Sequence, residues 1–279
     1  MKILIIIVLS IFSIITLWMC FGQTHIPNQL IYLPPPIQIH REDAIPSNEY
    51  QQTILSINNR YTPLKTLCGD ISAIASAKIT ANLWGRISFE KKQNFRMQLS
   101  SRFNSEIDIG SNQQYFWFWS RRMKPSYLYY SLHKDIKKAP LKTLFHPLWM
   151  MECLGIDEID LKGATIYQQE NCIAVRQIRT GTMDQLVVKI TLIDPKKQAI
   201  IGHYLYNDDL KLIASSEVLE FQNYKQFLIP KRIRMLWHEE NAGMELTLSR
   251  VIINSQINKQ LWEMPTNMPK RNLATLLSP

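Results

Sequence analysis

The sequence predicts a mainly β (α+β) protein built on a single, strongly curved antiparallel sheet. Three observations predict this fold class. Apolar and polar residues alternate along most of residues 79–253, which is the two-residue period of strands with one buried face. Turn-forming residues separate these short segments. Residues 47–60 and 141–154 break the alternation, and we expect both to be helices that cover the sheet.

Length and composition limit the classes of protein that fit. The chain has 279 residues, of which 46% are hydrophobic and 20% charged, so it can bury one sizeable core and is not disordered. Its formal net charge is +9, but Lys and Arg occur singly or in pairs, so no nucleic-acid-binding arm is expected. A diffuse positive surface favours an anionic bilayer or an acidic partner, and a solvated face that maintains solubility explains it equally well.

The first twenty residues are predicted to be a targeting segment. Lys2 is their sole charge, and the uncharged run Ile3–Met19 would reach only ~25 Å as a helix, short of the ~30 Å hydrocarbon core, so a signal peptide fits better than a stable span. Cys20 follows that run and resembles the lipidated Cys of a bacterial lipoprotein signal. Because bulky Trp18 and Met19 precede it where a small residue is usual, an uncleaved signal anchor with an incidental Cys stays an alternative.

A tether and a helix are expected next. Residues 21–46 contain five prolines and little periodicity, which indicates an extended tether. Ser47 is a favourable helix N-cap residue, and Pro63 stops the pattern that follows it. That pattern predicts an amphipathic helix over 47–60, because apolar residues recur at helical spacing, namely Tyr50, Ile54, Ile57 and Tyr61.

The chain as a whole predicts roughly ten to twelve strands, drawn from thirteen candidate segments, and two or three helices. The candidate strands are residues 68–77, 79–90, 95–103, 106–109, 114–121, 126–132, 164–167, 173–179, 186–193, 200–206, 211–221, 231–238 and 244–253. Gly110-Ser111-Asn112 is expected to be a turn. Residues 115–119 (Tyr-Phe-Trp-Phe-Trp) are apolar on both faces, so one face should meet the core or a cavity and the other a covering helix or loop. Pro147 indicates either a kinked helix over 141–154 or a short turn followed by residues 148–154.

Catalytic and metal-binding patterns are missing from the sequence. It contains none of the GxSxG, HExxH, Walker-type or GxGxxG motifs, and no cysteine pair has CxxC spacing, so we expect neither an enzyme, nor a metal site, nor a cofactor. Asp194, Asp208 and Asp209 are explained by turns. One disulfide is possible, with Cys153 and Cys172 as the nearest pair, but buried free thiols are the preferred interpretation, also for Cys68.

Several motifs, in order, resemble the LolA/LolB family of bacterial lipoprotein carriers. In the N-terminal half they are the amphipathic helix, Asn82-Leu83-Trp84, the basic turn Lys91-Lys92, Phe95-Arg96-Met97, and the Asp-Gly turn and aromatic strand within 108–119. In the C-terminal half they are Asp194-Pro195, the turn 207–209, Pro230 opening a strand, and the closing element 251–265. The resemblance covers residues 47–265 and leaves 266–279 as a C-terminal tail.

The resemblance implies an incomplete barrel whose open side is covered by helices, with an apolar cavity that takes up acyl chains. The implied cavity residues are Leu83, Ile87, Phe89, Phe95, Met97, Leu99, Ile107, Ile109, Phe116 and Phe118. Leu148, Trp149 and Met151 would form a lid. For each residue taken singly, packing in a filled core is the alternative. Lys91 and Lys92 stand where the family has an Arg-Pro whose Arg contacts the lid helices, and Lys lacks the planar guanidinium fork, which puts that contact in doubt.

The implied function is a periplasmic, membrane-tethered carrier that sorts lipoproteins to the outer membrane, lipidated at Cys20. Its expected partners are lipoprotein acyl chains or lipid and a bacterial envelope membrane, without nucleic acid or metal. A sensor or scaffold with the same fold that binds a protein partner is the alternative. A weaker third hypothesis is an unrecognised enzyme.

Overall fold

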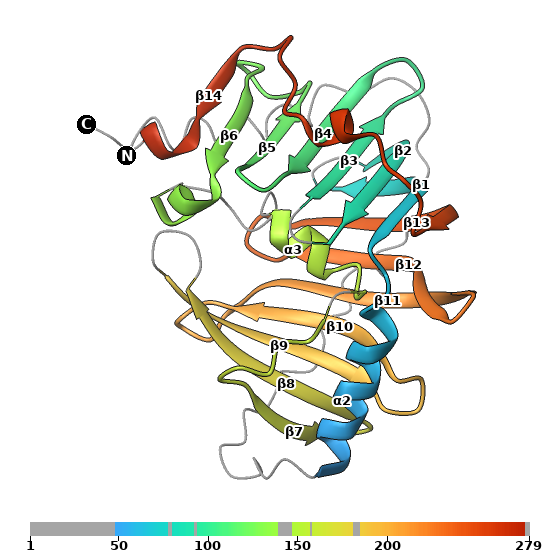
Figure 1. The fold of residues 1–279 in the computed structure, drawn as a ribbon. Helices are drawn as coiled ribbons and strands as arrows, with labels where there is room; N and C mark the ends of the chain where they lie inside the picture. The colour runs from blue at the N-terminus through green and yellow to red at the C-terminus, as the bar shows by residue number, and fades with distance from the viewer. Residues whose placement is uncertain are drawn as a thin grey trace.

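The structure, a computed structural model, describes residues 48–77, 80–91, 94–138, 147–156, 158–180 and 185–276. Their fourteen strands form one curved sheet, which confirms the predicted fold class (Figure 1). The strands are β1 (Thr66–Ser76), β2 (Thr80–Glu90), β3 (Asn94–Ser100), β4 (Ser105–Ser111), β5 (Tyr115–Ser120), β6 (Leu128–Leu132), β7 (Thr165–Gln169), β8 (Cys172–Thr180), β9 (Leu186–Asp194), β10 (Ala199–Tyr206), β11 (Leu212–Tyr224), β12 (Phe227–Trp237), β13 (Ala242–Ile253) and β14 (Lys270–Asn272).

The strand order explains how two meanders make one sheet. It runs β14-β6-β5-β4-β3-β2-β1-β13-β12-β11-β10-β9-β8-β7. The chain therefore starts at the centre with β1, moves outward to β6, crosses to the opposite edge at β7, and returns strand by strand until β13 pairs with β1. Every neighbouring pair is antiparallel except β14 and β6, which are parallel.

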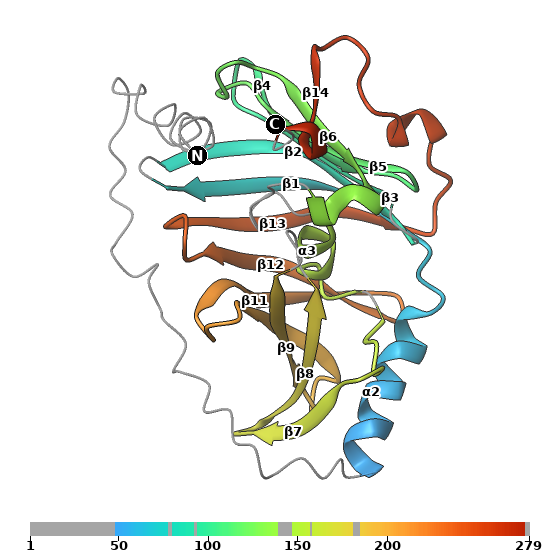
Figure 2. The ribbon, with the colours of Figure 1, turned by 90° about the vertical axis from the view of Figure 1, so that its left-hand side faces the viewer.

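Two α-helices lie on the same side of the sheet (Figure 2). The helix α2 (Asn48–Tyr61) begins and ends within one residue of the prediction, and its apolar stripe is buried. Its last residue, Tyr61, also donates a hydrogen bond from its hydroxyl to the Leu228 carbonyl at 2.5 Å. The helix α3 (Pro147–Glu152) begins at Pro147, where a missing N–H costs nothing, and ends two residues before the predicted end. Residues 141–146 lie outside the described ranges. Within the described ranges, neither helix has the length and apolar character of a membrane-crossing segment.

Two local predictions are wrong. Gly110 and Ser111 belong to β4, and the turn follows them. A Cβ on Gly110 would lie 2.1 Å from the ring of Trp117, so the glycine provides room for a neighbouring strand's indole and does not form the turn. Pro230 does not open a strand either. It lies inside β12, next to a register shift between Glu220 and Phe221 on β11, where an absent N–H is tolerated.

The chain beyond β13 crosses the outer face of the sheet, and we call residues 254–269 the C-terminal strap. Arg96 on β3 donates hydrogen bonds to the strap carbonyls of Leu261 and Glu263 at 3.0 and 3.1 Å. The guanidinium of Arg96 also lies 5.7 Å from the centroid of the fully buried Trp117 ring. The outer face of the aromatic strand β5 thus lies under a covering loop, as predicted. After the strap, β14 pairs with β6 and Leu273 is buried, so the fold continues into the residues expected to form a tail.

Candidate functional site

All ten predicted cavity residues lie on one face of the sheet. Strand register shows this, because directly paired residues share a face. One row runs Ile87, Met97, Ile109 and Phe118 across β2, β3, β4 and β5. The row on one side contains Phe89, Phe95 and Phe116, and the row on the other side contains Leu99 and Ile107. Leu83 lies on the same face of β2, before Ile87.

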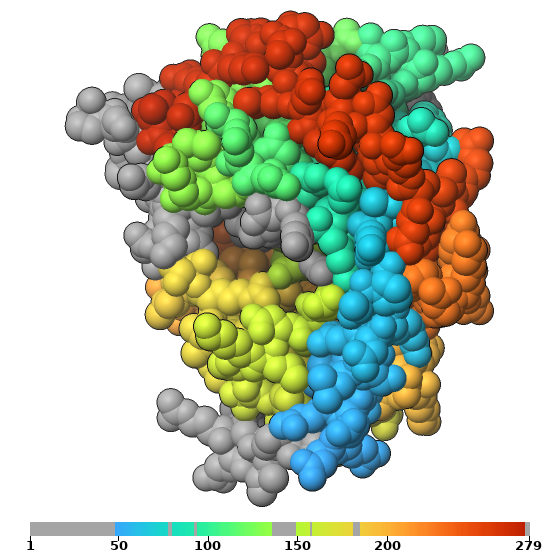
Figure 3. Space-filling view, in the orientation of Figure 1, coloured from blue at the N-terminus to red at the C-terminus, as the bar shows by residue number. Residues whose placement is uncertain are grey.

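This apolar face is closely packed. All ten residues except the partly buried Ile107 are buried, and they belong to one continuous core with residues of β11 to β13. The structure therefore brings them together on one face, where their side chains contribute to the core of the domain. Figure 3 shows a hollow in one face of the molecule, between the green strands of one half and the yellow strands of the other.

The helix α3 lies over this face, between the two halves of the sheet (Figures 1 and 2). Trp149 and Met151, two of the predicted lid residues, are buried and join the same core. The third, Leu148, belongs to α3, but its side chain lies outside the described part of the structure. The ring centroids of Trp149 and His203 on β10 lie 6.2 Å apart in an edge-on contact.

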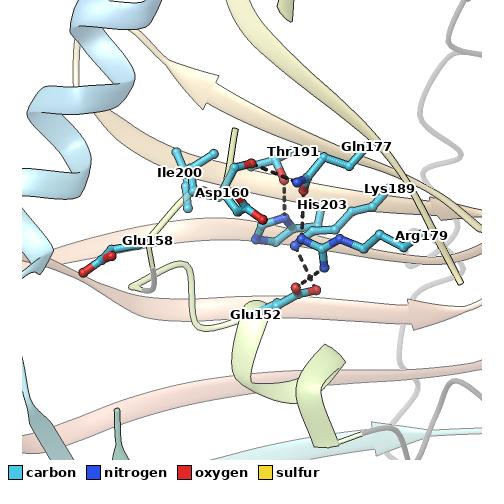
Figure 4. Close-up of a pocket in the computed structure, with 10 residues that line it drawn as sticks. Glu152, Glu158, Asp160, Gln177, Arg179, Lys189, Thr191, Ile200 and His203 are labelled. Atoms are coloured by element: carbon cyan, nitrogen blue, oxygen red, sulfur yellow. Dashed lines mark hydrogen bonds and ion pairs between the residues drawn. The ribbon is translucent and has the colours of Figure 1, made fainter. Parts of the chain in front are cut away.

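A buried ion cluster joins the end of α3 to the sheet (Figure 4). The carboxylate of Glu152 pairs with Lys189 on β9 at 2.8 Å and with Arg179 on β8 at 2.5 Å. The Lys189 side chain is only 6% exposed, so its ammonium group has little access to water. We call Glu152, Arg179 and Lys189 the α3 ion cluster. No local sequence pattern predicts this cluster, although the inward-facing Lys189 in the apolar strand β9 is a signal for it.

The protonation states of this cluster follow from burial and charge. Burial alone would raise the pKa of Glu152, but Lys189 and Arg179 outweigh it and lower that pKa to about 2. Burial lowers the pKa of Lys189, and Glu152 opposes that shift. Burial, and then Lys189, lower the pKa of His203 to about 3, so His203 is neutral at pH 7. The cluster therefore holds a carboxylate between two cations beside a neutral imidazole.

A small cavity adjoins the cluster (Figure 4). Its volume is about 40 Å³, enough for water but not for an acyl chain. His203 lines it, and the Nδ1 atom of His203 lies 3.1 Å from the Thr191 hydroxyl. Thr191 is twelve residues from His203 in sequence, and the pairing of β9 with β10 brings the two side chains together. This arrangement joins the end of α3 to strands β8 and β9.

The predicted basic contact involves Lys91. Its ammonium group donates to the Tyr61 carbonyl at the end of α2 at 2.8 Å and pairs with Glu158 at 3.0 Å. The same carbonyl also accepts the Leu64 N–H at 3.0 Å, and a cation at a helix C-terminus is favourable because it offsets the negative end of the helix dipole. Lys91 thereby joins α2 to the segment that follows α3. Lys92 and the predicted lipidation residue Cys20 lie outside the described residues.

The described cysteines form no disulfide. Cys68, Cys153 and Cys172 are free, so the pairing of Cys153 with Cys172 is not made, and of the three only Cys153 is fully buried. Among the described residues, no group of three or more His, Cys, Asp or Glu side chains is placed to hold a metal ion.

One curved sheet around an apolar face, with helices on that face, is consistent with a LolA-like incomplete barrel. Solved structures of that type are similar to this chain. They include a putative outer membrane lipoprotein-sorting protein domain from Vibrio parahaemolyticus, with a TM-score of 0.55, 10% identity, and coverage of 77% of this chain and 97% of that one. A LolA superfamily protein from Nitrosomonas europaea gives a TM-score of 0.50 at 12% identity, with 75% and 96% covered.

A DUF1329 family protein from Desulfovibrio piger has a TM-score of 0.53 at 8% identity, covering 76% of this chain and 95% of that one. No protein-family profile matches the sequence, and no curated protein sequence matches it. Identities this low establish likeness of fold alone. The resemblance to LolA-type proteins inferred from the sequence is confirmed at that level.

Proposed function

We propose that this protein is an exported, membrane-tethered carrier that binds the acyl chains of lipoproteins or lipids against the concave face of its sheet. The observation that carries the proposal is the continuous apolar surface of β2 to β5, with α3 lying over it. The similarity in fold to a lipoprotein-sorting domain supports it. Sorting of lipoproteins to the outer membrane is the finer form of the same proposal.

Such a function needs apolar surface and no catalytic group. Burial of one methylene contributes ~0.8 kcal/mol, so a chain of about fifteen methylenes gains on the order of 12 kcal/mol before ordering costs. Met97 and Met151 suit this surface because the flexible thioether side chain adapts to different ligands. We accordingly propose binding without catalysis.

The membrane tether belongs to the same proposal. An apolar N-terminal segment and the proline-rich residues 21–46 would hold the domain on the periplasmic side of a bacterial envelope membrane. Lipidation at Cys20, with the outer membrane as the favoured location, and an uncleaved signal anchor are the two forms of attachment.

A second candidate function is a sensor or scaffold that binds a protein partner without transport. The close packing of the predicted cavity residues favours it, because side chains that already fill a core leave less room for a ligand. The two functions differ in whether α3 leaves the apolar face to admit an acyl chain.

Native mass spectrometry of residues 47–279, expressed in a periplasm and purified without detergent, tests the proposal. Copurified lipid or acylated protein, or uptake of added fatty acid or lipopeptide, is the expected result. A clean apo mass together with no uptake would refute transport and favour the scaffold.

Variants of one strand sharpen this test. Leu83→Asp places a carboxylate on the apolar face and should abolish uptake, whereas Asn82→Asp alters the exposed opposite face of β2 and should not. Thermal unfolding of both variants separates the two functions. If the Leu83→Asp variant stays folded but loses uptake, the apolar face is open to ligand. If that variant is unfolded at every temperature measured, the apolar face is a filled core.

A further inference from the structure

The outer face of the sheet contains a groove beneath the C-terminal strap. At one end of the strap, the side-chain oxygen of Asn254 accepts a hydrogen bond from the Lys65 N–H at 2.7 Å, and the Ser255 carbonyl accepts one from the Thr66 hydroxyl at 2.9 Å. At the other end, the Arg96 guanidinium donates a hydrogen bond to the Leu261 carbonyl. Residues between these two attachments arch over the sheet and form one wall of the groove.

The groove has the size of a small-molecule site. Its volume is about 720 Å³, within the range typical of ligand pockets. Strands β1, β2, β3 and β13 form its floor. Ile252 on β13 contributes apolar surface together with Ile257 and Leu261 of the strap, and Gln98, Ser88 and Asn258 contribute polar groups. This mixture suits a molecule with both an apolar and a polar part.

The charges at the groove are unequal. Arg86 on β2 and Arg250 on β13 both line it, and both pair with the single carboxylate of Asp70. The third arginine of the groove, Arg96, is matched by Asp108 at 2.7 Å. Two exposed guanidinium groups thus share one carboxylate, which leaves one positive charge for an anion. Guanidinium groups bind carboxylate and phosphate through two parallel hydrogen bonds.

A β-bulge shapes this edge of the groove. Strand register shifts between Cys68, which pairs with Ile252, and Asp70, which pairs with Ser249. Arg250 and the residue after it therefore oppose the single residue between Cys68 and Asp70. Arg250 has a φ of 49°, a conformation rare for residues other than glycine. Bulges redirect side chains, and this one brings Arg250 to the groove beside Asp70.

We propose that this groove binds an anionic amphiphile. Its phosphate or carboxylate group contacts Arg86 and Arg250, and its apolar part lies against Ile252, Ile257 and Leu261. The site is independent of the carrier function proposed above, because it lies on the opposite face of β1, β2 and β3. Loss of acyl-chain binding at the concave face leaves it intact.

The test uses the full chain in phosphatidylcholine nanodiscs, with empty nanodiscs as the blank. The probes are dihexanoylphosphatidate, dihexanoylphosphatidylcholine and inorganic phosphate, each titrated calorimetrically below its micelle concentration. We expect the phosphatidate to bind more tightly than the other two. Arg86→Gln and Arg250→Gln should each weaken its binding roughly tenfold, the size expected for a hydrogen-bonded charge.

Two further variants complete the design. Arg121→Gln removes an exposed arginine outside the groove and should change nothing. Ile257→Asn should weaken the binding of phosphatidate but not the binding of inorganic phosphate. Equal binding of phosphatidate and phosphatidylcholine, wild-type affinity in both arginine variants, or no binding of phosphatidate to the wild type would each overturn the proposal. If inorganic phosphate binds as tightly as phosphatidate, the proposal of an amphiphilic ligand is refuted, and the groove is a site for free phosphate.

Discussion

Removing the carboxylate of the α3 ion cluster should destabilise the protein far more than removing a surface carboxylate. In Glu152→Gln, Lys189 stays almost fully buried and loses the carboxylate that lies 2.8 Å from its ammonium group. An uncompensated buried charge costs about 3–5 kcal/mol, a large part of the 5–15 kcal/mol by which a typical domain is stable. Glu217→Gln is a matched control, because Glu217 is 58% exposed and lies 3.8 Å from Arg234, so its loss should cost less than about 1 kcal/mol.

Urea unfolding of both variants measures this difference as a shift in midpoint at constant slope. The double variant Glu152→Gln with Lys189→Met removes both the carboxylate and the buried ammonium group, so it should recover most of the lost stability. A loss below about 1 kcal/mol in Glu152→Gln would refute the reasoning. So would a double variant no more stable than Glu152→Gln alone.

Three other predictions concern neighbouring groups. The pKa of His203 is about 3 in the folded protein, below its usual 6.5, so as the pH falls the unfolded chain takes up the proton first. The contribution of His203 to stability is therefore complete above pH 6.5, and below that pH it should fall by about 1.4 kcal/mol per pH unit toward pH 3. By urea unfolding, His203 alone should make the protein about 2 kcal/mol less stable at pH 5 than at pH 7. Burial also lowers the pKa of His238, which adds to the difference, and His203→Gln should reduce it, since Glu152 contributes only below its ordinary pKa. Lys91→Met should cost about 1–2 kcal/mol and speed amide exchange at the end of α2, whereas Lys65→Met should change neither. Burial raises the pKa of the Cys153 thiol to about 12, so a disulfide reagent should label Cys68 and Cys172 first, and rapid labelling of Cys153 in folded protein would contradict this.

Local periodicity predicted the apolar face, because the side of a strand on which a residue lies depends on its neighbours in sequence. The alternation therefore predicts that Ile87, Met97 and Phe118 lie on the buried face of their strands, without knowledge of which strands pair. The same rule predicted α2 from its apolar spacing. Strand alternation also located most of the sheet within a few residues.

The rest of the site depends on contacts that no local pattern encodes. Glu152 and Arg179 are 27 residues apart in sequence, and they meet only because the chain crosses from β6 to the opposite edge of the sheet. Gly110 is a residue type typical of turns, but it belongs to β4, because the ring of Trp117 occupies the space that a side chain at this position would need. The strand β14 is too short for a periodic signal and exists because β6 offers it an edge.

The α3 ion cluster is better explained by position than by stability. Apolar side chains of similar volume would cost less to bury than Glu152 and Lys189, so a gain in stability does not account for these charges. A carboxylate that is satisfied at one place only, between β8 and β9, fixes where α3 ends on the sheet, and an apolar contact would let the helix slide. The double variant Glu152→Gln with Lys189→Met separates the two roles. It should unfold near the wild-type urea midpoint and yet exchange the amide protons of residues 149–153 faster, and wild-type exchange rates in that variant would show that the apolar contacts of Trp149 and Met151 alone hold α3 in place.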